Sequence, residues 1–127
     1  MSYRTIQTGG APAAVGPYSQ GVVAGDLLFT AMQIALDPAT GEMLGETAGD
    51  QARQCLRNIK VIVEAGGSRM DRVVKTTIYL TDISEFGNVN AIYAEFFETA
   101  LPSRGVLEVS ALPKGALVAV EAVAAIG

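Results

Sequence analysis

Hydrophobic and polar residues follow a helical period most clearly over residues 47–65, where apolar side chains recur at intervals of three and four. Thr47 opens this stretch and is followed three residues later by Asp50, a pair that resembles a capping box. Gly66 and Gly67 come after it and are typical of a helix end. We therefore predict an amphipathic helix over residues 47–65. Its apolar stripe consists of Ala48, Ala52, Cys55, Ile59 and Ile62.

A second helical pattern begins after Asp82, which can cap a helix that extends to about Glu98. The apolar residues of this stretch share one helical face, and we expect them to pack in the core rather than to form a stacking platform. That stripe consists of Phe86, Val89, Tyr93 and Phe96.

Strand-like patterns fill much of the remaining chain. Residues 72–81 alternate between two faces, as expected for a strand. The segment 104–125 holds two β-favouring runs around residues 112–115, a Pro- and Gly-containing cluster that is typical of a turn. Three further strands are predicted at residues 3–7, 20–24 and 27–30, the last two joined by a hairpin turn at Gly25-Asp26.

The predicted order of elements is therefore β-ββ-α-β-α-ββ. Two strand–helix–strand units with right-handed crossovers place both helices on the same side of one sheet. We predict an α+β fold in which one mixed β-sheet carries two α-helices on one face. The strands nevertheless have apolar residues on both faces, so a single subunit would leave a large apolar surface in water. We expect a homo-oligomer that buries this second face.

Two charged residues stand out in the segment 104–125. Arg104 opens the first run, and Glu121 lies among apolar residues in the second, where an unpaired carboxylate is costly to remove from water. If the runs pair antiparallel with Val106 opposite Glu121, Arg104 and Glu121 are diagonal neighbours on one face. A register shift of one residue would place them on opposite faces. A structural ion pair and a functional site both stay open on these grounds.

Composition narrows the classes of function. The chain of 127 residues, 50% of them hydrophobic, suits one domain over residues 1–127. The net charge of −4 and the absence of a Lys/Arg-rich run argue against nucleic acid as a partner. No apolar run is long enough to span a bilayer, and the start lacks the hydrophobic region of a signal peptide. We expect a cytoplasmic protein without a nucleic-acid or membrane partner, with its single cysteine, Cys55, in the core.

The chain contains no histidine. This absence removes Ser-His-Asp triads, His-ligated zinc sites and histidine-based ribonuclease chemistry. With one cysteine and no histidine, a transition-metal site is not expected either. Any proton transfer must therefore use Glu, Asp, Lys, Tyr or water.

Short motifs are distributed along essentially the whole chain, and their shared order and spacing are more specific than any one of them. They are Ala11-Pro12-Ala13, Gly16-Pro17-Tyr18-Ser19-Gln20, Gln51-Ala52-Arg53-Gln54, Val74-Lys75-Thr76-Thr77, Val89-Asn90, Tyr93-x-x-Phe96-Phe97, Pro102-Ser103-Arg104, Leu107-Glu108-Val109, Leu112-Pro113 and Val120-Glu121-Ala122. In these motifs the chain resembles the RidA/YjgF family, also called the endoribonuclease L-PSP family.

The resemblance implies a chorismate-mutase-like subunit and a homotrimer with three clefts, each between neighbouring subunits. Archetypal members hydrolyse reactive enamines and imines, such as 2-aminoacrylate, to 2-keto acids and ammonia without a metal or organic cofactor. In that pattern Arg104 would hold the substrate carboxylate, and Glu121 would position or activate water. Both are candidate catalytic residues, and Tyr18 and Asn90 are candidate substrate-binding residues together with Arg104. The resemblance also favours the register in which Val106 faces Glu121.

Two segments depart from the family pattern. Ala31-Met32-Gln33 stands where Ser-Gly-Gln is usual, so a hydroxyl is lost at Ala31 and bulk is added at Met32. Arg104-Gly105-Val106 stands where Arg-Ser-Cys is usual, so a thiol is lost at Val106. These departures bear on the substrate and rate more than on carboxylate binding, because the arginine is retained.

Alternatives stay open for two residues and for the function. Tyr18 is equally interpreted as a loop aromatic that packs on the core, and Asn90 as a side chain that satisfies backbone groups at a helix end. The protein as a whole could be a non-catalytic binder or sensor of 2-keto acids or other small carboxylates, which needs Arg104 but no turnover. A ribonuclease or translation inhibitor matches the family's name, but the acidic charge and the absence of histidine weigh against it.

Overall fold

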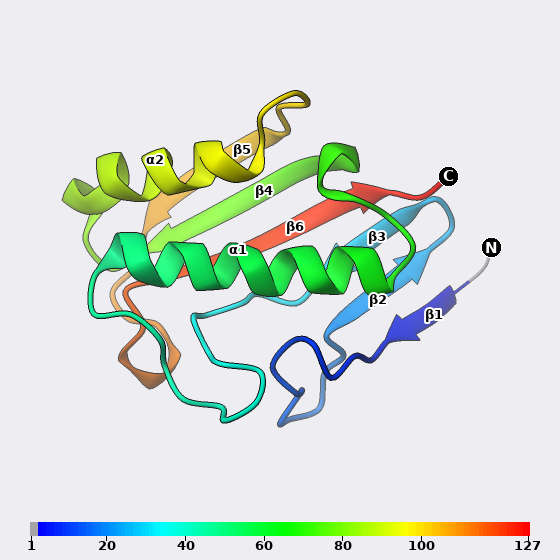
Figure 1. Ribbon diagram of the computed structural model, residues 1–127, viewed down its shortest axis with the longest axis horizontal. Helices are drawn as coiled ribbons and strands as arrows, with labels where there is room; N and C mark the ends of the chain where they lie inside the picture. The colour runs from blue at the N-terminus through cyan, green and yellow to red at the C-terminus, as the bar shows by residue number, and fades with distance from the viewer. Residues whose placement is uncertain (1–2) are drawn as a thin grey trace.

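The computed structural model describes residues 3–127, which form a six-stranded sheet with two helices across one face (Figure 1). The strand order is β1-β2-β3-β6-β4-β5, and every neighbouring pair is antiparallel except β4 and β5, which are parallel. The predicted α+β class, with a mixed sheet and both helices on one side, is confirmed. The elements are β1 (Tyr3–Ile6), β2 (Gly21–Ala24), β3 (Leu27–Thr30), α1 (Ala48–Ala65), β4 (Val73–Leu80), α2 (Phe86–Phe96), β5 (Ser103–Glu108) and β6 (Val118–Ala125).

Helix α1 forms where its spacing and end signals predict it. The Thr47 hydroxyl accepts a hydrogen bond from the backbone N–H of Asp50 (3.1 Å), which satisfies one of the unpaired donors of the first turn. Gly66 ends the helix, and a Cβ atom at this position would collide with Leu28 and Ile6. Glycine is therefore needed there because the helix end packs closely on the sheet.

Helix α2 begins later and ends earlier than predicted. The carboxylate of Asp82 accepts hydrogen bonds from the backbone N–H and the hydroxyl of Ser84, which supports a 3₁₀ turn at Ile83–Glu85 before α2 starts. At the other end the backbone of Phe97 leaves the helical conformation (φ −133°), and its buried ring lies 4.6 Å from that of Tyr93 between centroids.

No helix within residues 3–127 combines the length and apolar character needed to cross a membrane.

The two strands and the turn expected over residues 104–125 are present, but the antiparallel pairing of the two strands, which the family resemblance favours, is wrong. β5 and β6 are not neighbours, because β4 lies between them, parallel to β5 and antiparallel to β6. Val106 consequently pairs with Ile78 and not with Glu121, which lies opposite Thr77. Figure 1 shows β6, in red, in the middle of the sheet and β5 beyond β4.

Burial explains this strand order. β6 reads VAVEAVAA and is mostly buried, so it gains from a central position with a strand on each side. No residue of β5 is buried, as expected for a strand at the sheet edge. The parallel pairing of β4 and β5 follows from the connection through α2, since parallel strands require such a crossover.

The core lies between the two helices and the sheet. Leu56 and Ile59 of α1 pack there with Ile78 of β4 and Val120 of β6, and all four side chains are fully buried. Cys55 belongs to the same core, as predicted, and burial raises the pKa of its thiol to about 12. A thiol with so high a pKa carries almost no thiolate and is inert at neutral pH.

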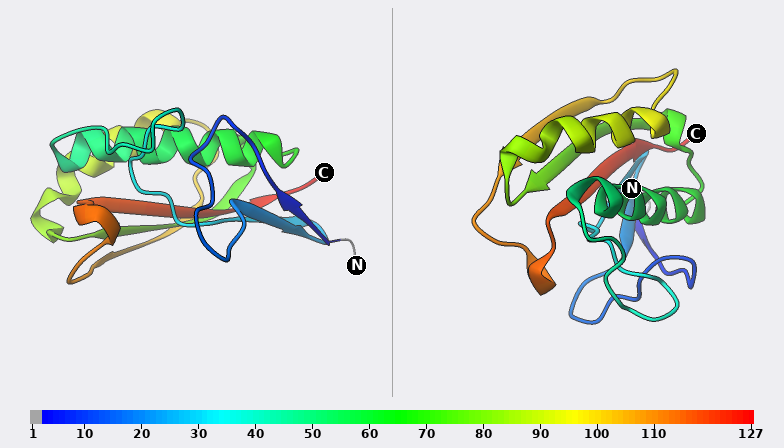
Figure 2. Two further views of the ribbon diagram at one scale, coloured as in Figure 1. Left: turned by 90° about the horizontal axis from the view of Figure 1, so that it is seen from below. Right: turned by 60° about the vertical axis from the view of Figure 1, so that its left-hand side comes forward.

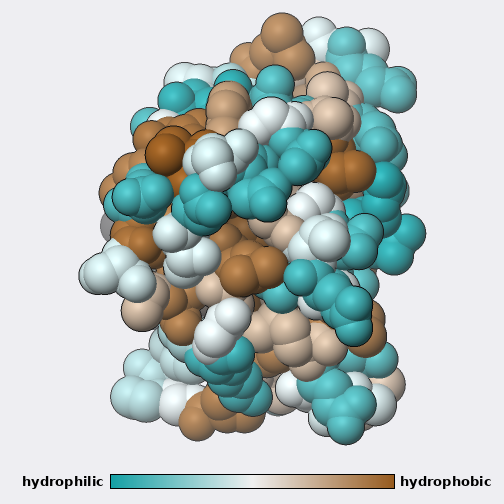
Figure 3. Space-filling view, turned by 90° about the vertical axis from the view of Figure 1, so that its left-hand side faces the viewer, coloured by the Kyte–Doolittle hydropathy of each residue, from teal (hydrophilic) through white to brown (hydrophobic). Residues whose placement is uncertain are grey.

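The opposite face of the sheet has no helix over it within residues 3–127 (Figure 2, left). Leu27 and Phe29 of β3 and Leu107 of β5 point to this open face and stay exposed, Phe29 to 43%. By contrast, the end of the molecule at which both helices begin has hydrophobic residues interspersed among hydrophilic ones (Figure 3). The open sheet face thus carries exposed apolar side chains, as the strand patterns indicate.

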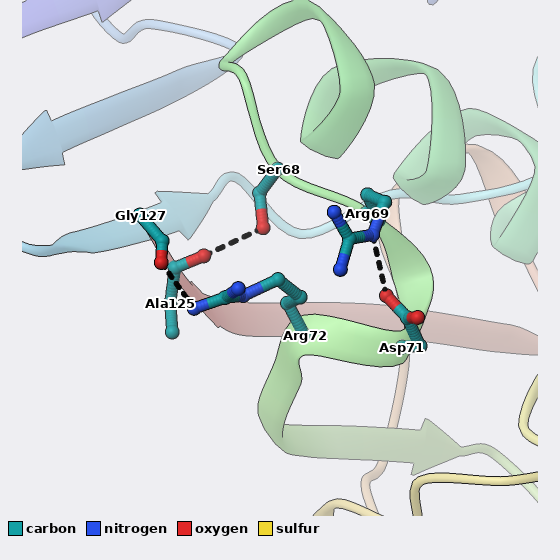
Figure 4. Close-up of polar contacts among 6 residues, drawn as sticks. All are labelled: Ser68, Arg69, Asp71, Arg72, Ala125 and Gly127. Carbon is teal, nitrogen blue, oxygen red and sulfur yellow. Dashed lines mark hydrogen bonds and ion pairs between the residues drawn. The ribbon is translucent and has the colours of Figure 1, made fainter.

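The end of β6 is tied to the connection between α1 and β4 (Figure 4). The Ser68 hydroxyl donates a hydrogen bond to the carbonyl oxygen of Ala125 (2.7 Å). The guanidinium of Arg72 donates to the carbonyl oxygen of Gly127 (2.7 Å). These contacts hold the end of β6 beside the start of β4 and so support its central placement.

We expect a homotrimer in solution, because exposed apolar side chains on the open sheet face favour an interface and the family resemblance implies three subunits. Light scattering at micromolar concentration should give three times the chain mass of 13.2 kDa. Phe29→Asp, which places a charge on the open face, should lower this mass. Leu101→Asp, which changes a more exposed apolar residue (79%) outside the strands, should not. A wild type that stays monomeric would contradict the interface and the number of subunits together.

Candidate functional site

Arg104 lies near the start of β5, on the side of the sheet that α2 covers. Its Nη1 donates a hydrogen bond to Asn90 Oδ1 (2.7 Å), and its guanidinium carbon lies 5.1 Å from the ring centroid of Phe86 and 4.8 Å from that of Tyr93. Phe86, Asn90 and Tyr93 follow each other at intervals of four and three residues, so they share one face of α2. We call these three residues the arginine frame, since they hold the guanidinium against two rings and an amide.

The arginine frame shows what Asn90 does and includes two residues, Phe86 and Tyr93, whose contact with Arg104 was not predicted from the sequence. Asn90 lies in the interior of α2 and bonds to Arg104, so its interpretation as a helix-end side chain is wrong. The structure thus brings two of the predicted site residues together. The apolar stripe predicted for this helix includes Phe86 and Tyr93 but does not indicate their contact with Arg104. Their helical spacing with Asn90 is the signal that could have revealed it.

Arg104 has no carboxylate partner among residues 3–127. The ion pairs of this part of the chain are Arg53–Glu95 (2.7 Å) and Arg69–Asp71 (2.9 Å), the second of which is drawn in Figure 4. Asn90 is a neutral acceptor that engages only Nη1, and Arg104 is exposed. Within one chain, the interpretation of Arg104 and Glu121 as a structural ion pair is therefore wrong. The other N–H groups of the guanidinium can bind an anion from outside.

Tyr93 contacts Arg104 with its ring and Thr76 with its hydroxyl. The two hydroxyl oxygens are 2.7 Å apart, and both side chains are buried. Burial raises the pKa of Tyr93, whereas its hydrogen bond with Thr76 and the charge of Arg104 act in the opposite direction. The phenol therefore stays protonated at neutral pH and serves as a hydrogen-bonding group.

Glu121 faces the opposite side of the sheet from Arg104. It lies opposite Thr77 of β4, whereas Arg104 lies opposite Thr76, and successive residues of a strand point to opposite faces. The Tyr79 hydroxyl donates a short hydrogen bond to Glu121 Oε1 (2.5 Å). This bond, together with burial and the carboxylate charge, raises the pKa of Tyr79 to about 12. The prediction that Arg104 and Glu121 share one face is wrong for a single chain.

Tyr18 lies on the loop that precedes β2, where it is 52% exposed. Its interpretation as an aromatic packed on the core is therefore wrong. It lines a largely apolar pocket of about 630 Å³ together with Ala31, Met32 and Lys114. The departures from the family pattern at Ala31 and Met32 thus lie in a cavity beside Tyr18. This pocket contains neither Arg104 nor any residue of the arginine frame.

The loop that carries Tyr18 is anchored by the buried side chain of Gln20. Its Nε2 donates hydrogen bonds to the carbonyl oxygens of Thr8, Ala11 and Pro12 (3.0, 3.2 and 2.8 Å). Its Oε1 accepts from the backbone N–H of Thr8 (2.7 Å). Both polar groups of the amide are thereby satisfied although they are buried. The motif that ends at Gln20 indicates a loop, but it carries no signal for this anchor.

The candidate residues therefore fall into separate groups on one chain. Arg104 and Asn90 form the first group beneath α2. Tyr18 lines the separate pocket that it shares with Ala31 and Met32. Glu121 stands apart from both, on the open face. Within residues 3–127, no three Cys, Asp or Glu side chains cluster closely enough to hold a metal ion. The first group is the one whose chemistry, a framed and unpaired guanidinium, points directly to an anionic ligand.

Comparisons with known proteins agree with the motifs. The family model described as Endoribonuclease L-PSP matches residues 8–126. The RutC family protein y4sK of Sinorhizobium fredii is 51% identical over 118 residues, which cover 93% of this chain and 94% of that protein. The 2-iminobutanoate/2-iminopropanoate deaminase of Escherichia coli is 45% identical over 124 residues, which cover 95% of this chain and 96% of that protein.

Solved structures extend the similarity to the fold. The crystal structure of Escherichia coli TdcF with bound serine superposes with a TM-score of 0.93 at 38% identity, and the match covers 98% of this chain and 99% of that chain. The similarity in sequence and in structure thus spans nearly the whole length of both proteins. The chain belongs to the Endoribonuclease L-PSP family, also known as the RidA/YjgF family.

Proposed function

We propose that this protein hydrolyses small 2-imino and 2-enamino acids, such as 2-aminoacrylate, to 2-keto acids and ammonia. The observation that carries the proposal is Arg104, whose guanidinium is held by the arginine frame and has no carboxylate partner within residues 3–127. A planar guanidinium binds a carboxylate through two parallel hydrogen bonds. The deaminase name of the Escherichia coli relative and the serine bound to TdcF support this substrate class.

The reaction depends mainly on positioning. An enamine substrate first becomes the imine as its β-carbon gains a proton and its nitrogen loses one. Water then adds to the electrophilic imine carbon to form a carbinolamine, and a proton moves from its oxygen to its nitrogen. The C–N bond then breaks, and ammonia leaves as the keto group forms. Arg104 holds the substrate carboxylate beside the reacting carbon, and Glu121 positions or activates the water. Water supplies the keto oxygen, ammonia leaves, and no atom is oxidised or reduced overall, so no electron acceptor is required.

The site is a cleft between neighbouring subunits of a homotrimer. In one chain Arg104 and Glu121 face opposite sides of the sheet, and the pocket beside Tyr18 contains neither of them. A site that uses all three side chains is therefore favoured where two copies of the chain meet. In this arrangement one subunit supplies Arg104 with its frame, the next supplies Glu121, and Tyr18 comes from one of the two.

A coupled assay tests the proposed activity. An amino-acid dehydratase generates the imine in solution, semicarbazide traps it, and formation of the keto acid is followed with and without this protein. We expect the protein to reduce the trapped product and to accelerate keto-acid formation. Unchanged trapping in the presence of folded, trimeric protein would contradict the deaminase.

A sensor of 2-keto acids is the second candidate function. It is favoured by the fact that no acid or base of the same chain forms a hydrogen bond or ion pair with Arg104 among the described residues. Such a protein would bind 2-oxobutanoate by calorimetry and leave the trapped imine unchanged in the coupled assay. RNA cleavage that survives Arg104→Ala would indicate a separate site or a contaminating nuclease.

Met32 should restrict the size of the substrate. It is 37% exposed and lines the pocket of about 630 Å³ beside Tyr18, so its thioether side chain occupies space next to a ligand bound there. We expect the wild type to prefer the imine derived from serine over the imine derived from leucine. Met32→Gly should shift the ratio of the two kcat/KM values toward leucine by about 10-fold or more, since one methylene in a pocket is worth roughly 10–200-fold.

Met32→Leu is the matched control, because it keeps the bulk of the side chain and should keep the preference for the serine-derived imine. Light scattering and thermal unfolding check that both variants remain folded and assembled. An unchanged ratio in a folded Met32→Gly protein would mean that Met32 does not line the substrate site.

A further inference from the structure

The arginine frame is itself supported by a hydrogen bond that the proposed reaction does not use. The Tyr93 hydroxyl and the Thr76 hydroxyl are 2.7 Å apart, with Thr76 fully buried and Tyr93 6% exposed. Thr76 is also the residue that lies beside Arg104 in the parallel pairing of β4 and β5. Thr76 therefore forms a side-chain hydrogen bond with Tyr93, and its backbone lies beside that of Arg104 in the neighbouring strand.

We infer that Tyr93 is a positioning residue, whose hydroxyl bond to Thr76 fixes the place of its ring and thereby the orientation in which Arg104 presents its guanidinium to a carboxylate. The inference rests on the proposed carboxylate site at Arg104. It adds to that site a buried support, the hydroxyl pair of Tyr93 and Thr76, that lies beneath the arginine frame.

The packing around Tyr93 shows how the support works. The ring of Phe97 lies 4.6 Å from that of Tyr93, and the guanidinium carbon of Arg104 lies 4.8 Å from it. The hydroxyl bond to Thr76 holds the far end of the side chain, so the ring is packed between Phe97 and Arg104 and anchored at its hydroxyl. A long arginine side chain loses conformational freedom when it binds a ligand, and a frame that orders it beforehand reduces that loss.

The test separates orientation from stability. Tyr93→Phe and Thr76→Val each leave one buried hydroxyl without its partner, so each should lower the thermal midpoint. The double variant removes both hydroxyl groups together and should recover most of that midpoint. If Tyr93 positions Arg104 through this bond, the double variant still binds 2-oxobutanoate about three- to tenfold more weakly than the wild type. In turnover, KM should rise while kcat stays unchanged.

A conservative variant keeps the proposal open to refutation even where Thr76→Val folds poorly. Thr76→Ser retains the hydroxyl but loses a buried methyl group, so it should be less stable and yet bind 2-oxobutanoate like the wild type. If Thr76→Ser weakens binding as much as Thr76→Val does, the hydroxyl bond does not orient the arginine. Wild-type affinity in the double variant would overturn the inference equally.

Arg104→Ala distinguishes this failure from failure of the proposed function. If Arg104→Ala loses 2-oxobutanoate binding while the double variant binds normally, only the positioning role of Tyr93 is wrong. If Arg104→Ala binds as tightly as the wild type, the carboxylate site is wrong, and the positioning role falls with it.

Discussion

Replacing Arg104 by alanine is expected to abolish imine hydrolysis and to weaken 2-oxobutanoate binding by at least about thirtyfold, as is typical when one member of a desolvated charge pair is truncated. The guanidinium is the one cationic group that the arginine frame presents, through the bond to Asn90 and the rings of Phe86 and Tyr93. Removing the guanidinium leaves the substrate carboxylate without the two parallel N–H donors that would bind it. Calorimetry with 2-oxobutanoate and the coupled imine assay measure the two effects.

Two control variants sharpen this result. Arg104→Lys keeps the positive charge but loses the planar fork, so it should bind more weakly than the wild type and more tightly than Arg104→Ala. Arg53→Ala removes another arginine that contacts α2, through its ion pair with Glu95, and should leave binding unchanged. Light scattering should show the same mass for all three variants. Wild-type binding by Arg104→Ala would contradict the carboxylate site.

Local signals in the sequence were sufficient for α1 but not for the order of the strands. The Thr47 cap and Gly66 act on backbone groups a few residues away, and the structure confirms both. The turn at Pro113–Gly115 also exists, yet the chain does not return beside β5 after it. The position of β6 depends on the burial that β3 and β4 offer from distant parts of the chain. A strand–turn–strand pattern alone does not show that strands from distant parts of the chain pair with β6 in place of β5.

The same limit applies to the candidate site. Family motifs pointed to Arg104 and Asn90, and the structure joins them in one hydrogen bond. The contribution of Phe86 and Tyr93 could not be separated from core packing, because an aromatic residue follows the same helical spacing whether its ring meets a side chain of the core or a guanidinium. The face on which Glu121 lies depends on which strand pairs with β6. Because that strand is β4 and not β5, Glu121 faces the opposite side of the sheet from Arg104.

Replacing Glu121 by glutamine is expected to slow turnover by about 10²–10⁴ while 2-oxobutanoate still binds, because the amide cannot take up a proton from water. The change preserves the shape of the side chain and an oxygen that accepts the hydrogen bond of Tyr79. Glu121 also lines a pocket of about 170 Å³ on the open face, and the polar residues Thr30, Lys75 and Thr77 line it as well. Since the proposed homotrimer covers this face, Glu121 would serve the site of a neighbouring subunit.

Mixed trimers test this division of labour between subunits. Arg104→Ala and Glu121→Gln chains are unfolded together in equal amounts and refolded, with each variant refolded alone as the control. If each cleft takes Arg104 from one subunit and Glu121 from the next, about a quarter of the clefts in a random mixture contain both intact residues. Activity should then return to roughly that fraction of the wild type, far above either variant alone. No recovery, with the mixture trimeric by light scattering, would mean that Glu121 does not act across the interface. A Glu121→Gln chain that fails to assemble would instead assign Glu121, with Tyr79, to holding the open face together.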